Sequence, residues 1–169
     1  MSDVKPAEGP VNIGEAPSSV GFLLSQLGFV MARRFQQVMA PLGLEPRQFL
    51  LMRLVAFNEG KTQQALGEAL NIPASRMVAI VDELERRGLL ERHPDPADRR
   101  VRRLYVTAEG RRLLQQALEV AMAHEQRVSA PLGPAEREQL LALLHRLADD
   151  QQITAGVHPD LTTPDPAGC

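Results

Sequence analysis

Residues 89–110 read LLERHPDPADRRVRRLYVTAEG, and the fold follows from this stretch. Residues 89–93 and 102–106 are short runs of the kind that form β-strands. The segment between them, PDPADRR, holds two prolines and two aspartates, so it cannot continue either strand regularly. The stretch therefore predicts a two-stranded hairpin whose loop carries a pair of adjacent arginines.

Helical patterns flank the hairpin on both sides. Apolar residues recur there at helical spacing, and polar caps, prolines or glycines mark the ends of the runs. The expected upstream helices run from Ser19 to Ala40, from about Pro46 to the stop at Asn58-Glu59-Gly60, from the Thr62 cap through Leu70, and from Ala74 to Arg87. After the hairpin, Thr107 caps a long helix and Gly133-Pro134 starts a last one.

The order of these elements predicts a mainly α-helical, winged helix-turn-helix fold. Two short helices meet at a tight turn, Asn71-Ile72-Pro73, and the hairpin follows as the wing. In this arrangement the second short helix, residues 74–87, enters the DNA major groove, which is about 12 Å wide and admits one helix.

Charge is distributed unevenly along the chain. The whole protein has a net charge of -2, but residues 86–112 contain nine arginines and only four acidic residues. The rest of the chain carries ten basic and seventeen acidic residues. A basic island on an acidic body is typical of a phosphate-binding surface, although clustered arginines can also be an ordinary solvated surface.

The helix over residues 74–87 supplies the candidate base contacts. Arg76 can bind guanine with two hydrogen bonds, and Ser75 can reach a base or a phosphate. Alternatively, Arg76 pairs with an acid on its own helix, such as Glu83. Amide side chains at the start of the preceding helix can hold phosphates. The candidates on these two helices are Gln63, Gln64, Ala74, Ser75, Arg76 and Ala79.

The wing, residues 94–102, supplies further contacts with DNA. Arg99 and Arg100 can reach the adjacent minor groove or its phosphates, and Arg102 adds another cation. Asp98 would repel phosphate, so its expected role is structural. It would orient Arg100 or Arg102 by an ion pair, or cap the turn.

Residues 89–110 resemble the wing signature of the multiple antibiotic resistance regulator (MarR) family. The matching features are Arg92, the Asp95-Pro96 pair, the Asp98-Arg99-Arg100 core and the Thr107-Ala108-Glu109-Gly110 helix start. The upstream elements occur in the family's order as well, so the resemblance covers roughly residues 18–150.

The resemblance implies a homodimeric transcriptional regulator, usually a repressor, on a pseudo-palindromic DNA site. Apolar residues outside the small winged domain independently favour a dimer, with an ordinary intramolecular bundle as the alternative. These residues are Leu23, Leu27, Val128, Leu140, Leu144 and Leu147. The expected organisation is a flexible arm at 1–17, a dimerisation region at 18–45 and 107–150, a DNA-binding domain at 46–106 and a flexible tail at 151–169.

Members of this family commonly sense small aromatic or anionic molecules between the dimerisation helices and the winged domain. The resemblance therefore implies an effector pocket in this chain. The candidate lining residues are Met31, Arg34, Phe35, Phe49, Met52 and Arg53. Methionine and phenylalanine at helical spacing can equally be plain core, and the arginines, Arg33 included, can be solvated or paired.

Other functional classes find little support in the sequence. No Gly-rich phosphate loop, nucleophile elbow or paired-histidine metal motif indicates an enzyme, a cofactor or a metal site. The single cysteine, Cys169, is the last residue, which excludes an internal disulfide and any multi-cysteine metal site. No apolar run approaches the roughly 20 residues of a membrane span, and no leader peptide is recognisable. We therefore expect a cytoplasmic protein.

Two alternatives to a sequence-specific regulator stay open. The first is a winged-helix module that binds other proteins, although the arginines of the wing and of the recognition helix argue against it. The second is a protein that binds DNA without sequence preference, in which Ser75 and Arg76 do not discriminate between bases.

Overall fold

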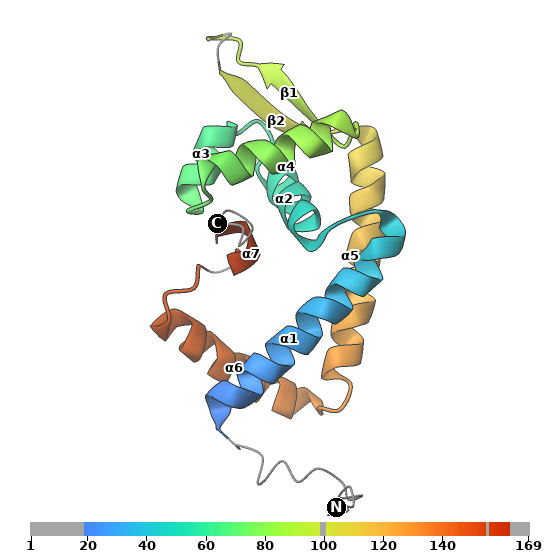
Figure 1. Ribbon diagram of the computed structural model, residues 1–169, viewed down its shortest axis with the longest axis vertical. Helices are drawn as coiled ribbons and strands as arrows, with labels where there is room; N and C mark the ends of the chain where they lie inside the picture. The colour runs from blue at the N-terminus through green and yellow to red at the C-terminus, as the bar shows by residue number, and fades with distance from the viewer. Residues whose placement is uncertain (1–18, 99–100, 155, 163–169) are drawn as a thin grey trace, which may run out of the picture.

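A computed structural model shows how the elements are arranged (Figure 1). It describes residues 19–98, 101–154 and 156–162, so the expected N-terminal arm and the wing-tip residues Arg99 and Arg100 lie outside it. The described chain is mainly α-helical with one two-stranded antiparallel sheet, which confirms the predicted fold class. No helix in this part of the chain has both the length and the apolar character needed to cross a membrane.

The elements follow the predicted order along the chain. The winged domain comprises α2 (Pro46–Phe57), α3 (Gln63–Ala69), α4 (Ala74–Arg86), β1 (Leu90–Pro94) and β2 (Arg102–Val106). Outside it lie α1 (Val20–Met39) with a short 3-10 turn (Ala40–Leu42), α5 (Ala108–Ser129) and α6 (Pro134–Asp150). A further helix of one turn, α7 (Pro159–Thr162), is absent from the expectations based on sequence.

Hydroxyl caps begin three of the helices, as the sequence predicts. The side chains of Ser19, Thr62 and Thr107 accept hydrogen bonds from main-chain N–H groups three residues later, at 3.3, 3.0 and 2.9 Å. After α4, Gly88 has a φ of 69°, a left-handed conformation that glycine adopts without strain. This turn directs the chain from α4 into β1.

The core of the winged domain is aliphatic. Its fully buried members from α2, α4 and the sheet are Leu51, Met52, Val55, Met77, Val81, Leu84, Leu90 and Leu104. The two strands pair with Leu90 opposite Val106. Leu104 also exchanges hydrogen bonds of 3.0 Å with Lys61 and Gly60 in the α2–α3 loop. The base of the wing is thereby fixed to the helical core, and the strands β1 and β2 project away from it (Figure 1).

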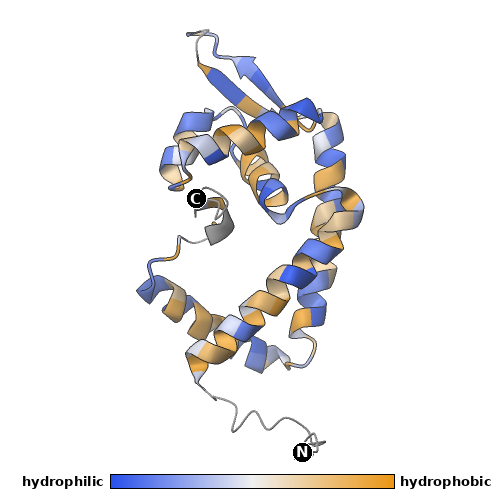
Figure 2. Ribbon diagram, in the orientation of Figure 1, coloured by the Kyte–Doolittle hydropathy of each residue, from blue (hydrophilic) through white to orange (hydrophobic). Residues whose placement is uncertain are grey.

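The long helices α1 and α5 pack against each other and extend away from the winged domain (Figure 1). Apolar stripes run along α1 and α6 (Figure 2). The six apolar residues expected to need a second surface are all exposed, from 36% for Leu144 to 55% for Leu27, and α6 buries none of its residues. Within the described chain, an intramolecular bundle does not cover them, so that alternative is wrong there.

The segment after α6 folds back onto the winged domain. Val157 and Leu161 join the buried core, with 8% and 2% of their surface exposed, and α7 lies against α2. The prediction of a flexible tail from residue 151 onward is therefore wrong for this part of the tail. Two apolar residues spaced four apart are too short a pattern to indicate a helix, and their burial depends on α2, a distant segment of the chain.

The junction between the wing and α5 leaves no room for a side chain at Gly110. A Cβ atom added here would lie 2.0 Å from the main-chain oxygen of Leu89 and 2.9 Å from Cγ1 of Val106. Because the backbone must shift to relieve this contact, we expect Gly110→Ala to lower the free energy of unfolding in urea by about 2 kcal/mol or more. Gly21→Ala is the control, since its added Cβ meets nothing within 4 Å. Equal stabilities of the two variants would contradict the close approach.

Candidate nucleic-acid interface and adjoining pocket

The first turns of α4 present the predicted reading face. Its exposed residues are Ala74, Ser75 and Ala79, and Arg76 is half-buried beside them. The opposite side of the helix is buried through Met77, Ile80, Val81 and Leu84. A recognition helix that binds in the DNA major groove contacts base edges through its N-terminal residues, so an accessible N-terminal turn suits this role.

Glu83, the carboxylate named as an alternative partner for Arg76, accepts hydrogen bonds from Arg86 at 2.7 Å. The bond to Arg86 holds the pKa of Glu83 below its ordinary value. This pair lies one helical turn or more beyond the reading face, toward the C-terminal end of α4.

The two glutamines at the start of α3 line a groove of about 610 Å³ between α3 and α4. Arg92 donates to Oε1 of Gln63 at 3.0 Å, and Nε2 of Gln64 donates to Glu68 at 2.8 Å. The wing therefore orients Gln63, whereas Gln64 is held by its own helix. Both amides lie beside the predicted reading face of α4, and both already have contacts within the protein. Their binding to phosphates stays a prediction.

Arg92 of β1 joins the wing to both short helices. Its guanidinium donates to Asp82 of α4 at 2.5 Å, to Glu85 on the next turn of α4, and to Gln63 of α3. Only 19% of the Arg92 side chain is exposed. Sequence reasoning assigned Arg92 no contact of its own. A signal for this contact was available in the sequence. Two acidic residues, Asp82 and Glu85, stand three positions apart on one helix, and an arginine follows in the neighbouring strand.

Asp95 organises the base of the wing loop. It accepts hydrogen bonds from the N–H of Ala97 at 2.8 Å and from Nε of Arg103 at 2.7 Å. Arg103 also donates to the carbonyl oxygen of Gly60 at 2.5 Å, which ties the loop to the end of α2. The Ala97 hydrogen bond and the Arg103 guanidinium hold the pKa of Asp95 below its ordinary value, although burial acts in the opposite direction.

Asp95, three residues before Asp98, thus has a structural role in the wing, and the role expected of Asp98 stays a prediction. Asp98 is exposed, and its main-chain oxygen accepts the N–H of Val101 at 2.9 Å. Its expected partner Arg100 lies outside the described residues. Arg102 lies exposed at the start of β2, opposite Pro94.

At least five arginines of the basic island are bound to carboxylates. The pairs are Arg86–Glu83, Arg92 with Asp82 and Glu85, Arg103–Asp95, Arg111–Glu59 and Arg112–Glu109. Several of these acids lie outside residues 86–112 in sequence and join the island only through the fold. The linear count of charges therefore overstates the positive charge that the folded surface offers to phosphates.

A pocket of about 1060 Å³ lies where α1, α2 and α5 meet. Four of the predicted residues line it, namely Met31, Phe35, Phe49 and Arg53. Met52 instead belongs to the core with no exposed surface, and Arg34 is absent from the described lining, where Arg33 occurs. The prediction is wrong at Met52 and Arg34, because one step along a helix turns a side chain by roughly 100°.

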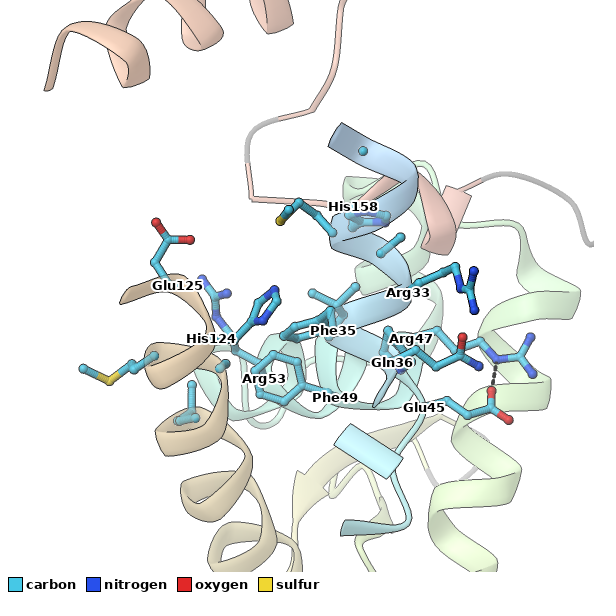
Figure 3. A pocket seen from close by; sticks show the side chains of 18 of the residues that line it. Arg33, Phe35, Gln36, Glu45, Arg47, Phe49, Arg53, His124, Glu125 and His158 are labelled. Atoms are coloured by element: carbon cyan, nitrogen blue, oxygen red, sulfur yellow. Dashed lines mark hydrogen bonds and ion pairs between the residues drawn. The ribbon is translucent and has the colours of Figure 1, made fainter. Parts of the chain in front are cut away.

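The walls of this pocket combine aromatic rings with cationic groups (Figure 3). The ring of Phe35 lies 5.8 Å from that of Phe49 and 5.7 Å from that of His124 on α5. Arg33, Arg47 and Arg53 also line the pocket, and Arg47 pairs with Glu45 at 2.6 Å. Such a pocket can accept a flat apolar group against the rings and an anionic group beside a guanidinium.

Comparisons with known proteins agree with this geometry. A model of the MarR family matches residues 42–101. A putative transcriptional regulatory protein for the hcr operon of Thauera aromatica is 35% identical over 116 residues, which cover 68% of this chain and 70% of that protein.

Two solved structures of the repressor CouR are also similar. CouR bound to a 23-mer DNA duplex has a TM-score of 0.72 and 33% identity, over 83% of this chain and 99% of that one. CouR from Rhodococcus jostii RHA1 bound to p-coumaroyl-CoA has a TM-score of 0.64 and 32% identity, over 78% of this chain and 92% of that one.

The lowered pKa of Asp95 predicts a pH dependence of stability. The unfolded value is about 3.9, so ionised Asp95 stabilises the fold above that pH and loses its contribution as the pH falls through the lower folded value. Asp95→Asn should therefore lose less stability than the wild type when urea unfolding is repeated at decreasing pH from 7 to 3. Arg103→Gln should weaken the same dependence, since it removes the partner. Parallel curves for all three proteins would contradict this role of Asp95.

Proposed function

This chain belongs to the MarR family of DNA-binding transcriptional regulators, and from that premise we propose that it is a homodimeric repressor released by a small molecule. It reads a pseudo-palindromic site through the recognition helix, residues 74–87, and the wing, residues 94–102. The alternatives are a winged-helix protein-interaction module and a DNA-binding protein without sequence preference.

The observation that carries the proposal is the coupling of wing and recognition helix through Arg92. Its contacts with α3 and α4 hold the two DNA-facing elements in one geometry. They also neutralise Asp82 and Glu85, two carboxylates of the helix that would approach the phosphates. A protein-interaction module has no need to neutralise these acids.

A second copy of the chain is the proposed cover for the apolar faces of α1, α5 and α6. Exposed leucines recur on α6 at Leu140, Leu144 and Leu147, and α1 adds Leu23 and Leu27. A soluble monomer rarely exposes contiguous apolar surface of this extent. In a two-fold dimer the recognition helices would lie about one helical turn of DNA apart, which requires two half-sites.

The pocket between α1, α2 and α5 is the proposed effector site. Its rings and arginines suit an aromatic compound with a negative charge, such as an aryl carboxylate or an aryl thioester of coenzyme A, the class to which the CouR ligand belongs. A bound effector would contact both the dimerisation helices and α2 of the winged domain. It can therefore favour one spacing of the recognition helices over another.

Selection from a library of random duplexes at moderate salt tests the proposed function. We expect enrichment of a palindrome whose half-sites lie about one helical turn apart. Binding that disappears as salt rises, with no enrichment, would instead indicate contact with the backbone alone. No binding at all would favour the protein-interaction alternative.

Arg76→Ala tests the recognition helix on the enriched site. We expect a loss of about 1–3 kcal/mol in binding free energy and relaxed base choice at one position per half-site. Arg102→Ala should weaken binding to all sequences more evenly and reduce its salt dependence. Arg127→Ala is the matched control, because it removes an equal charge at the far end of α5. Wild-type binding by Arg76→Ala would overturn the assignment of this residue.

Light scattering at micromolar concentration tests the dimer. We expect the wild type to have twice the mass of the chain, and Leu140→Asp with Leu144→Asp to shift it toward the monomer by placing charges on the proposed interface. Glu138→Gln with Glu119→Gln, at exposed polar positions of α6 and α5, is the control. A monomeric wild type would refute the dimer.

A further inference from the structure

The C-terminal strap, residues 156–162, is built into the winged domain although it follows the last long helix. Val157 and Leu161 are both buried in the core, and the one-turn helix α7 packs on α2. The N–H groups of these two residues bond to the main-chain oxygens of Thr154 and His158, at 3.1 and 2.9 Å. The strap therefore has two apolar anchors and an ordered backbone between them.

His158 lies between these anchors and forms part of the wall of the pocket. Figure 3 shows it reaching the pocket from the C-terminal segment, whereas Phe35 and His124 reach it from α1 and α5. The strap thus contributes to the wall of the pocket, together with residues of α1, α2 and α5. Because α6 precedes the strap and α2 receives it, the strap also links the helix proposed for dimerisation to the DNA-binding domain.

We propose that the strap is a ligand-binding element of the effector pocket, with His158 contacting the anionic part of the effector. This inference rests on the effector site proposed above. Val157 and Leu161 act as positioning residues, since their burial holds the imidazole at the pocket wall. By reciprocity, a strap that strengthens effector binding must itself be held more tightly when the effector is bound.

Anchoring of the strap is measured first, without any ligand. Hydrogen–deuterium exchange is compared between the full chain, the full chain with Val157→Ser and Leu161→Ser, and a chain that ends at Gln152. We expect faster exchange in residues 46–57 of both variants, because α2 loses its cover. Unchanged exchange in both would overturn the strap as a built element, and the shortened chain decides the matter if the double variant does not fold.

Ligand contact is measured with 8-anilinonaphthalene-1-sulfonate, an aromatic anion whose fluorescence reports binding. We expect the full chain to bind it, with slower exchange in residues 28–36 and 156–162. His158→Ala and the shortened chain should bind it about fivefold or more weakly. His145→Ala, an exposed histidine on α6, is the matched control and should bind as the wild type does. Equal affinities of His158→Ala and His145→Ala would overturn the role of His158.

The failure of the strap and the failure of the effector site give different results. If the full chain binds the probe in the pocket and the strap variants bind it equally well, the strap proposal alone is overturned. If the full chain leaves residues 28–36 unprotected at saturating probe, the effector site is overturned and the ligand-binding role of the strap with it.

Discussion

The geometry of the DNA-facing surface depends on one guanidinium. Arg92 is placed where β1, α3 and α4 meet, and its planar fork of donors contacts a residue of α3 and two residues of α4 at once. A lysine carries three donors on one nitrogen and does not span these acceptors in the same plane. The contact has two effects, since it sets the orientation of the wing and removes the charge of two acids from the recognition helix. Other ion pairs in the described part of the basic island join Arg86, Arg103, Arg111 and Arg112 to carboxylates of the scaffold.

The helix α2 connects this surface to the pocket. One side of α2 carries Phe49 into the pocket, and its other side places Met52 and Val55 in the core beneath α4 and β2. A close-packed core transmits displacement because it has no spare volume in which to absorb it. A molecule that moves α2 relative to α5 would thus move the recognition helix as well. The strap also packs on α2. The pocket, the core beneath the recognition helix and the strap are therefore all in contact with this one helix.

The sequence predicts the elements of this fold well because their signals are local. The caps at Ser19, Thr62 and Thr107, and the proline-rich loop between the strands, specify each start and stop within a few residues. The features that the sequence did not predict depend on contacts between segments that are distant along the chain. The strap has no periodic pattern. Met52 and Arg34 each stand one residue away from a lining residue, and one such step turns a side chain by roughly 100° about the helix. The role of Arg92 appears only when the strand and the helices are assembled. The exposure of Ala74, Ser75 and Ala79 was predictable, because an amphipathic helix presents its polar side outward, whereas their contact with DNA stays a prediction.

The pairing of α1 with α5 has a consequence for how the chain is made. These helices are separated in sequence by the entire winged domain, whose own contacts are shorter in range. During synthesis the contacts among α2, α3, α4 and the strands can therefore form before α5 has been made, while the packing of α1 must wait for α5 to be translated. Throughout that interval the residues of α1 that pack against α5 have no partner surface within the chain. The helix α1 is thus synthesised before the winged domain but completes its packing after it.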